Sequence, residues 1–434
     1  MYSTSTDYKN KILADSTRQL LNVYIDNNKI EDRYILECKI TYTLLDNDEF
    51  CFGSTPAKTV NLKIHKNALP DTYTRFYIES GITGETVPIG YFNVDEISKD
   101  DDYTVSLTLI DDMSLFEFNY DGSTLNYPAT MLMVLQDICL KAGVELGSTS
   151  FLNWDKQVAV YDNTVTARTY LGYIAEQAGG FAIIGRDGKL YIRTIGEDTA
   201  DLALRYFSEY SWGERFKVSR IAYEDGVQDF KKGNEVNNTI WISSDNIYIV
   251  DQEQIDNIYN EYQDFEVYSF SGTSIVDPAW DMGDSIIINN RKIIFQGELE
   301  YKSKFKASIS SNIQAKTKEE TTATKVSDKT KIRRVQSQID QVEGTITQLV
   351  QENGEFENKL TQVEQTVDSI NQNVENIINY KREVQGTTEI HLEDAGEADI
   401  LELEIQGNKT YESNLYPGEN VFPSESLQPN MEVI

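Results

Sequence analysis

Apolar and polar side chains alternate along much of the first 120 residues, which is the pattern of half-buried β-strands. The longest run is 34–45 (YILECKITYTLL), and shorter runs follow at 60–64, 73–79, 91–97 and 103–110. Turn clusters rich in Asp, Asn, Gly and Pro separate these runs. Several short strands at this spacing predict an antiparallel barrel or sandwich.

The hydrophobic period changes from two to 3.6 after Pro128, which predicts a helix that ends at Gly143. Its apolar face carries Met131, Leu132, Leu135, Ile138 and Cys139. A second helix is predicted to begin after an N-cap at Thr166 and to end before Gly179 and Gly180. Its apolar face carries Tyr170, Leu171, Ile174, Ala175 and Ala178.

A β-hairpin is predicted directly after this helix. Asp187-Gly188 separates two β-type runs in FAIIGRDGKLYIRTI, a strong hairpin signal. Residues 123–200 are therefore interpreted as a small α+β module.

Residues 201–315 return to β-type alternation. The predicted strands are 240–243, 247–250, 265–270, 285–288 and 292–300. Trp212, Trp241 and Trp280 all fall in this part and are expected to be buried or half-buried anchors.

The sharpest pattern in the chain is a heptad repeat between residues 332 and 377. Stepping alternately by three and four residues meets fourteen positions, of which thirteen are apolar. The positions are Ile332, Val335, Ile339, Val342, Ile346, Leu349, Asn353, Phe356, Leu360, Val363, Val367, Ile370, Val374 and Ile377. Elsewhere in the span only Val350 is a large apolar residue. This seam predicts a coiled-coil rod that is roughly 70 Å long at about 1.5 Å per residue.

The composition of the seam favours a trimer. With Ile332 at position a and Val335 at d, ten of the fourteen residues are Ile or Val, and Leu occupies d only at Leu349. β-branched residues at both positions favour three or four strands over two. Asn353, next to Gly354, is interpreted as a polar residue that fixes register, the alternative being a local flaw. We predict a parallel homotrimer.

The residues after the rod are acidic. From residue 386 onward there are eleven Asp or Glu and one basic residue, Lys409, a net charge of −10. The run HLEDAGEADILELEIQG has β-like alternation at its end, whereas NLYPGENVFPSESLQPN contains three Pro and no clear period. The predicted organisation is a β domain (1–122), an α+β module (123–200), a second β domain (201–318), a linker with the coiled coil (319–384) and an acidic β-rich tip (385–434).

The net charge of the chain limits the kinds of partner that it is expected to bind. The chain of 434 residues has 71 acidic and 39 basic side chains, a formal charge of −32. Gripping nucleic-acid phosphates or an anionic membrane requires clustered Lys and Arg, so neither is expected. Solubility alone is the plainest explanation of such a charge.

Cysteine usage and the chain start indicate folding in a cytoplasm. Three cysteines (Cys38, Cys51, Cys139) are too few for a disulfide framework and are expected to be reduced. The start, MYSTSTDYKN, has no apolar signal region, and no apolar run approaches the roughly 20 residues that span a bilayer.

Catalytic patterns were sought and not found. The two histidines, His65 and His391, fall in different predicted domains and in no zinc pattern, and the cysteines are interpreted as core thiols. Walker and GxGxxG loops are missing, and the acidic runs at 100–102 and 111–112 are interpreted as turns rather than calcium sites. Carboxylate pairs for glycoside hydrolysis stay open, but nothing singles one out among 71 acids. We predict no catalytic residue, metal or cofactor.

Four segments carry a resemblance to a known family. They are GYFNVDEISKDDDYTVSLTLIDDM (90–113), LQDICLKAGVELGS (135–148), YDNTVTARTYLGYIAEQAGGFAIIGRDGKLYIRTI (161–195) and EIHLEDAGEADILELEIQGNKTYESNLYPGEN (389–420). With the order of domains, they resemble the tail hub or tail-tip proteins of Gram-positive siphophages and prophages. That family is also called prophage endopeptidase tail or tail-associated lysin, and it is similar to the baseplate hub of contractile phages. The resemblance covers roughly 20–310 and the tip, and none of its motifs is catalytic.

The resemblance implies a homotrimeric hub at the virion tail tip. Two tube-like β domains per chain would give six quasi-equivalent elements around the axis, matching a hexameric tube above them. The implied neighbours are the distal tail protein, the tape measure protein and receptor-binding proteins. A trimer would carry a formal charge of about −96, and an acidic lumen would let DNA pass without specific binding.

Two other functions compete with this one. Some relatives carry a C-terminal wall hydrolase, but only 57 residues follow Ile377, and they hold one His and no Cys. The endopeptidase name is therefore not carried over. The third hypothesis is a carbohydrate-binding tip for host cell-wall glycan, using Tyr411, Tyr416 and Phe422; the alternative is that these rings pack the tip or dock another tail protein.

Overall fold

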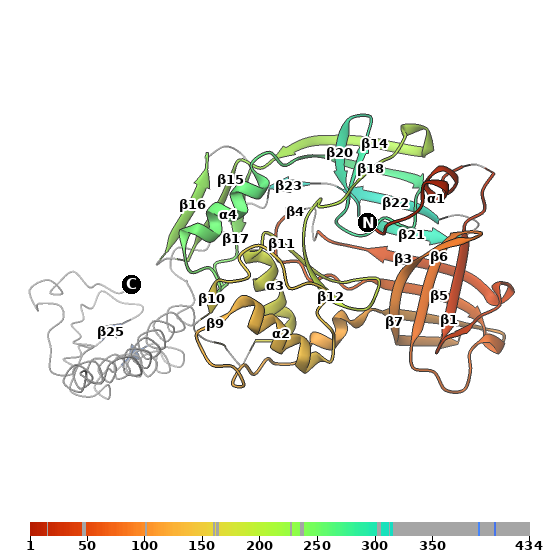
Figure 1. The fold of residues 1–434 in the computed structure, drawn as a ribbon, viewed down its shortest axis with the longest axis horizontal. Helices are drawn as coiled ribbons and strands as arrows, with labels where there is room; N and C mark the ends of the chain where they lie inside the picture. Colours follow the sequence, from red (N-terminus) through yellow and green to blue (C-terminus); the bar gives the residue numbers. More distant parts are fainter. Residues whose placement is uncertain are drawn as a thin grey trace, which may run out of the picture. The chain divides into compact units, whose positions relative to one another are not determined.

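The computed structural model describes residues 1–315 except 15, 46–48, 100–101, 159–160, 162–164, 226–227, 235–237, 302–304 and 312, together with 389–390 and 403–404. The chain divides into two compact units, Met1–Ala323 and Thr324–Ile434. In the second unit, β24 (Glu389–Ile390) pairs antiparallel with β25 (Leu403–Glu404). The first unit is mainly β, as predicted (Figure 1).

The alternating N-terminal runs form the strands expected of them. After the short helix α1 (Thr6–Lys11) come β1 (Leu20–Ile25), β2 (Asn28–Lys29), β3 (Ile35–Tyr42), β4 (Glu49–Phe50), β5 (Thr59–His65), β6 (Phe76–Ile82), β7 (Glu85–Lys99) and β8 (Thr104–Ile110). The long strand β7 pairs with β6 through its first half and with β8 through its second half. Two layers thus share one strand and enclose a core, in which Val23 and Ile78 belong to one layer and Leu62 and Leu107 to the other.

The α+β module contains both predicted helices and the predicted hairpin. Its elements are β9 (Ala129–Thr130), α2 (Met131–Ala142), β10 (Gln157–Val158), α3 (Ala167–Gln177), β11 (Gly180–Ile184) and β12 (Leu190–Thr194). Gly143 ends α2 in the left-handed region at φ +72°, where a side chain would be strained. The Thr166 hydroxyl caps α3 by accepting a hydrogen bond from the Thr169 amide at 3.3 Å.

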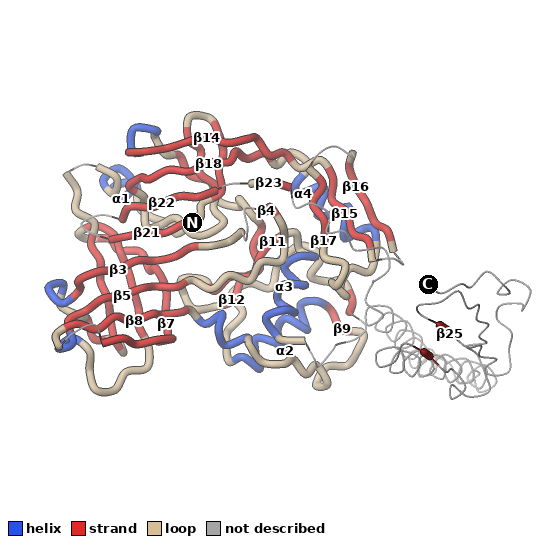
Figure 2. The backbone as a smooth tube through the Cα atoms, turned by 180° about the vertical axis from the view of Figure 1, so that it is seen from behind, coloured by secondary structure: helices blue, strands red, loops and turns tan. Residues whose placement is uncertain are grey.

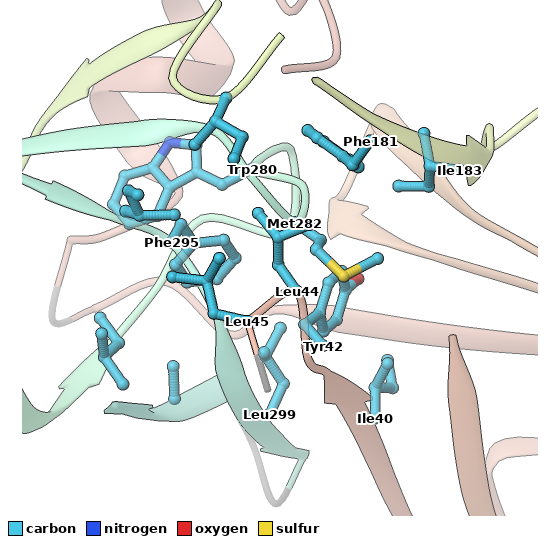
Figure 3. Packing of buried hydrophobic residues seen from close by; sticks show 14 of the residues in the cluster. Ile40, Tyr42, Leu44, Leu45, Phe181, Ile183, Trp280, Met282, Phe295 and Leu299 are labelled. Atoms are coloured by element: carbon cyan, nitrogen blue, oxygen red, sulfur yellow. The ribbon is translucent and has the colours of Figure 1, made fainter. Parts of the chain in front are cut away.

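The hairpin β11–β12 lies between two hydrophobic cores, which explains its unbroken apolar run. Phe181 and Ile183 face the large core that they share with Tyr42 and Met282 (Figure 3). The alternate residues Ala182 and Ile184 face the smaller core formed with α2 and α3. A strand buried on both faces loses the polar alternation of a surface strand.

The last part of the unit is β-rich with one further helix. Its elements are β13 (Thr199–Asp201), β14 (Phe207–Lys217), β15 (Arg220–Glu224), β16 (Asp229–Gly233), β17 (Thr239–Ile242), α4 (Gln252–Tyr262), β18 (Glu266–Ile275), β19 (Ser285–Ile288), β20 (Arg291–Ile294), β21 (Gly297–Tyr301), β22 (Phe305–Ser311) and β23 (Gln314–Ala315). Trp280 is buried and Trp212 and Trp241 are half-buried, as predicted.

Three sequence predictions in this part were wrong or incomplete. Residues 247–248 form a turn and 249–250 are irregular, because the Asn246 side chain accepts a hydrogen bond from the Tyr248 amide at 2.9 Å and holds the chain out of a strand. The run 292–300 is two strands, β20 and β21. Helix α4 was not predicted, although Asp251 and Gln254 form a capping box at its start.

An eleven-stranded sheet dominates the unit. Its order is β14-β18-β22-β21-β3-β5-β8-β7-β6-β1-β2, and most of it can be followed in Figure 2. The pairing of β21 with β3 joins strands from the two ends of the unit, more than 250 residues apart in sequence. Strands of both predicted β domains therefore share a single sheet.

Candidate functional surface

One face of this sheet is polar across eight consecutive strands, β14, β18, β22, β21, β3, β5, β8 and β7. On β3, β5 and β8, alternate residues such as Cys38, Leu62 and Leu107 are buried in the core. The residues between them point the other way and are half-buried or exposed. We call this side of the eight strands the polar face.

The register of the strands aligns polar side chains into rows. One row crosses all eight strands: Glu209, Thr273, Ser308, Glu298, Thr41, Thr59, Ile110 and Asn93. A second row contains Ile275, Lys306, Glu300, Lys39, Asn61, Thr108 and Glu96. Within them Lys39 Nζ lies 2.8 Å from Glu298 Oε1, and two further serines, Ser211 and Ser271, pair at 2.8 Å. Hydroxyls and mixed charges thus cover the sheet.

The charges of the polar face nearly balance. Its two rows and the shorter row Glu37, Lys63, Ser106 and Ser98 contain five glutamates and three lysines. Between β3, β5, β7 and β8 the face is hollowed over about 510 Å³, with Glu37, Lys63 and Glu96 among the lining residues. The described residues of these rows include no cluster of cations that could hold a phosphate chain.

The side chains of Cys38, Cys139 and His65 take part in the packing and hydrogen bonding of the first unit. The thiols of Cys38 and Cys139 are buried, and burial raises the pKa of each to about 12, which keeps them protonated. His65 Nδ1 accepts a hydrogen bond from the Asn67 amide at 3.2 Å. Among the described residues no three His, Cys, Asp or Glu side chains are grouped as metal ligands. His391 lies outside the described residues.

A buried ionic cluster ties distant segments together near the centre of the unit. The Asp281 carboxylate lies 3.2 Å from Lys58 Nζ and 3.2 Å from Arg186 Nε, and all three side chains are almost completely buried. Arg186 also donates to three backbone carbonyl oxygens, those of Pro88, Pro278 and Trp280. Full pairing is the condition under which buried charges are tolerated. This cluster was not predicted from the sequence, because its members are scattered over more than 200 positions.

The acidic run at 111–112 has a structural role. Asp111 accepts hydrogen bonds from the amides of Lys58 at 2.9 Å and Met113 at 3.1 Å and caps the short 3-10 helix Asp112–Phe116. Burial raises the pKa of Asp111 to about 6. The interpretation of this pair as a turn is consistent with these contacts.

The raised pKa of Asp111 predicts a pH effect on stability. A folded-state pKa above the unfolded value adds stability that is full below pH 3.8 and is lost as pH rises through about 6. Between pH 4.5 and 7, Asp111→Asn should therefore gain stability relative to the natural chain by roughly 2 kcal/mol. Urea unfolding of both chains at the two pH values measures this; a difference that does not change with pH would contradict it.

The residues predicted to form the trimer interface, Ile332 to Ile377, lie outside the described residues. The same holds for the tip residues Tyr411, Tyr416 and Phe422 and for the first two aspartates of the run 100–102. The polar face was not predicted as a unit. The alternation marked the outward positions of single strands, but the order of the strands decided which of them lie side by side.

None of the described helices combines the length and hydrophobicity that crossing a membrane requires. No protein-family model matches the chain, and no curated protein matches it.

Solved structures of three other proteins match about two thirds of this chain. A 43 kDa tail protein of prophage MuSo2 from Shewanella oneidensis is 12% identical, with a TM-score of 0.45 over 67% of this chain and 97% of its own. A tail protein from Neisseria meningitidis is 12% identical, with a TM-score of 0.42 over 68% of this chain and 98% of its own. A prophage tail protein from Listeria monocytogenes is 12% identical, with a TM-score of 0.43 over 66% of this chain and 94% of its own. These structural neighbours are tail proteins.

Proposed function

We propose that this chain is a structural component of a bacteriophage tail, a homotrimeric hub at the tail tip that closes the tube and projects a rod toward the host. The observation that carries the proposal is the polar face. It joins strands from both ends of the first unit into one wide, continuous surface. A hub on the path of DNA needs a wall of this kind, with one polar side that faces the solvent of the channel and one side that packs on the hydrophobic core.

The chemistry of the polar face suits a channel lining. Ser, Thr and Asn side chains such as Ser308, Thr41 and Asn61 are exposed or half-buried and would form hydrogen bonds with water, while the lysines are outnumbered by glutamates. DNA phosphates would find no cluster of cations and would pass without being held. We infer a weakly acidic lining, much less charged than the formal charge of −32 per chain suggests.

Trimer formation is assigned to the seam between Ile332 and Ile377. Three parallel rods from the second unit would hold three first units around a common axis. Each first unit would contribute two β parts to a ring with six quasi-equivalent elements. The distal tail protein, the tape measure protein and receptor-binding proteins remain the proposed neighbours, on the resemblance of the four sequence segments.

Electron cryo-microscopy of the tail end with threefold averaging tests this proposal. We expect three copies around the tail axis, with Thr41 and Thr108 on the side facing the channel. Copies located away from the axis, or a polar face turned to the outside of the tail, would contradict it.

A wall hydrolase is the competing function, and we expect no such activity. Among the described residues, the thiols of Cys38 and Cys139 are buried and protonated, and His65 Nδ1 accepts a hydrogen bond from the Asn67 amide. A zymogram of the purified full-length chain on Gram-positive cell walls should show no clearing, next to a lysozyme lane that does. A clear zone at the position of the chain would establish the hydrolase instead.

A further inference from the structure

We propose that a tyrosine-lined cleft in the first unit binds a neutral saccharide. The cleft has a volume of about 500 Å³ and lies between strands β6–β7 and the hairpin β11–β12. Four tyrosines line it, Tyr2, Tyr77, Tyr91 and Tyr191. We call it the tyrosine cleft. It is separate from the polar face, and the inference does not depend on the role in a phage tail.

Tyr77 and Tyr91, which line one wall of the cleft, belong to a row of three aromatic rings. Tyr24, Tyr77 and Tyr91 are directly opposite one another on β1, β6 and β7, with ring centroids 5.6 Å and 4.8 Å apart. The guanidinium of Arg75 lies 4.8 Å from the centroid of the Tyr91 ring and is itself bound to Asp112. A ring held from two sides offers contact area at little cost in conformational entropy.

The opposite wall is formed by Tyr191 on β12. Its ring lies so close to Gly147 and Gly185 that a Cβ at either position would come within 2.1 Å and 2.6 Å of it. The Tyr191 hydroxyl donates a hydrogen bond to Asp187 Oδ2 at 2.8 Å. The two glycines thus let the ring pack on the backbone, and the carboxylate fixes its rotation. Asp187 stands at the same cleft as a hydrogen-bond acceptor.

The cations of the cleft are already engaged, which argues against an anionic ligand. Arg186 gives its hydrogen bonds to Asp281 and to three carbonyl oxygens. Arg193 donates to Asp284 at 3.0 Å and to Asp198 at 3.2 Å. A phosphate or carboxylate ligand would have to displace these acids. A neutral ligand would not.

The remaining chemistry fits a sugar. Saccharides present apolar C–H faces and a rim of hydroxyl groups, and they need flat aromatic surfaces beside polar side chains with fixed positions. The tyrosine cleft supplies rings on two walls and the carboxylates of Asp187 and Asp198 at its edge. The volume lies within the range of small-ligand sites. A short neutral oligosaccharide is therefore the class of ligand that matches.

Titration calorimetry of the full-length chain tests the inference with two neutral probes, tri-N-acetylchitotriose and maltotriose, and with inorganic phosphate as the anionic comparison. We expect at least one sugar to bind with millimolar or tighter affinity and phosphate not to bind. Tyr191→Ala and Tyr91→Ala should each weaken sugar binding about tenfold, the effect expected on losing an aromatic contact. The matched control is Tyr103→Ala, a 67% exposed tyrosine outside the cleft, which should leave binding unchanged.

Tyr191→Phe distinguishes weaker binding from a loss of folding, because it keeps the ring and removes only the hydroxyl. The circular dichroism spectrum of this variant should be unchanged, and its affinity for the sugar should be reduced. Failure of both sugars to bind at 10 mM, binding of phosphate alone, or equal affinity in all the variants would overturn the inference. Each of these results would leave the proposal of a tail hub untouched, because that proposal rests on the polar face and the seam.

Discussion

Replacing Asp281 by Asn is expected to destabilise the first unit by about 3–5 kcal/mol, the cost of breaking a buried ion pair from one side. Burial alone would raise the pKa of Asp281, but the cations Lys58, Arg186 and Arg193 outweigh it and hold the pKa well below its usual range. The carboxylate is thus charged at every ordinary pH. Without it, the ammonium of Lys58 and the guanidinium of Arg186 would be left buried beside a neutral amide.

Urea unfolding followed by far-ultraviolet circular dichroism measures this loss. The matched control is Glu298→Gln, which breaks an ion pair of 2.8 Å to Lys39 on the polar face. Both side chains of that pair are partly exposed, so the control should cost no more than about 1 kcal/mol. A double variant Lys58→Met with Asp281→Asn should be less destabilised than the sum of the two single variants, because it removes one stranded charge. Equal losses in Asp281→Asn and the control would show that the cluster does not hold the unit together.

Replacing Ile339 and Ile346 by Asn is expected to abolish trimer formation while the first unit stays folded. Both residues occupy a positions of the predicted seam, and an amide there exchanges apolar contact for a polar group that must be buried in all three chains. The two positions are consecutive a layers with the d layer of Val342 between them, so the disruption covers about two heptads. Sedimentation velocity at micromolar concentration should show a monomer.

The control for this pair is Asp340→Asn with Thr347→Asn. These residues follow the same two isoleucines but occupy outward b positions of the heptad, so the trimer should persist. Circular dichroism and urea unfolding should give the first unit the same stability in both double variants. A trimer that survives the seam substitutions would place the contacts between chains elsewhere.

Local patterns predicted local structure well. Thr166 and Gly143 bounded α3 and α2 because capping depends on one or two residues at each end, which a sequence displays directly. Asp187-Gly188 predicted the hairpin correctly, because a tight turn also depends on a few adjacent residues. Helix α4 had a comparable signal in Asp251 and Gln254, and its capping box could have been found by the same reasoning.

Long-range arrangement could not be predicted in this way. The polar face depends on the pairing of β21 with β3, and the sequence of neither strand indicates which strand it pairs with. The ionic cluster brings together Lys58, Arg186 and Asp281, which look like ordinary surface charges when read one at a time. The incorrect prediction of a strand at 247–250 has a related cause. Tyr248 and Ile249 are buried, as in a strand, but a turn stabilised by Asn246 places them in the core.

The mass of the full-length chain in solution tests the central claim, that three copies assemble through the seam into a tail hub, most directly. Light scattering at micromolar concentration should give about 149 kDa, three times the 49.5 kDa of one chain. A mass of 49.5 kDa, or of twice that value, would contradict the trimeric hub.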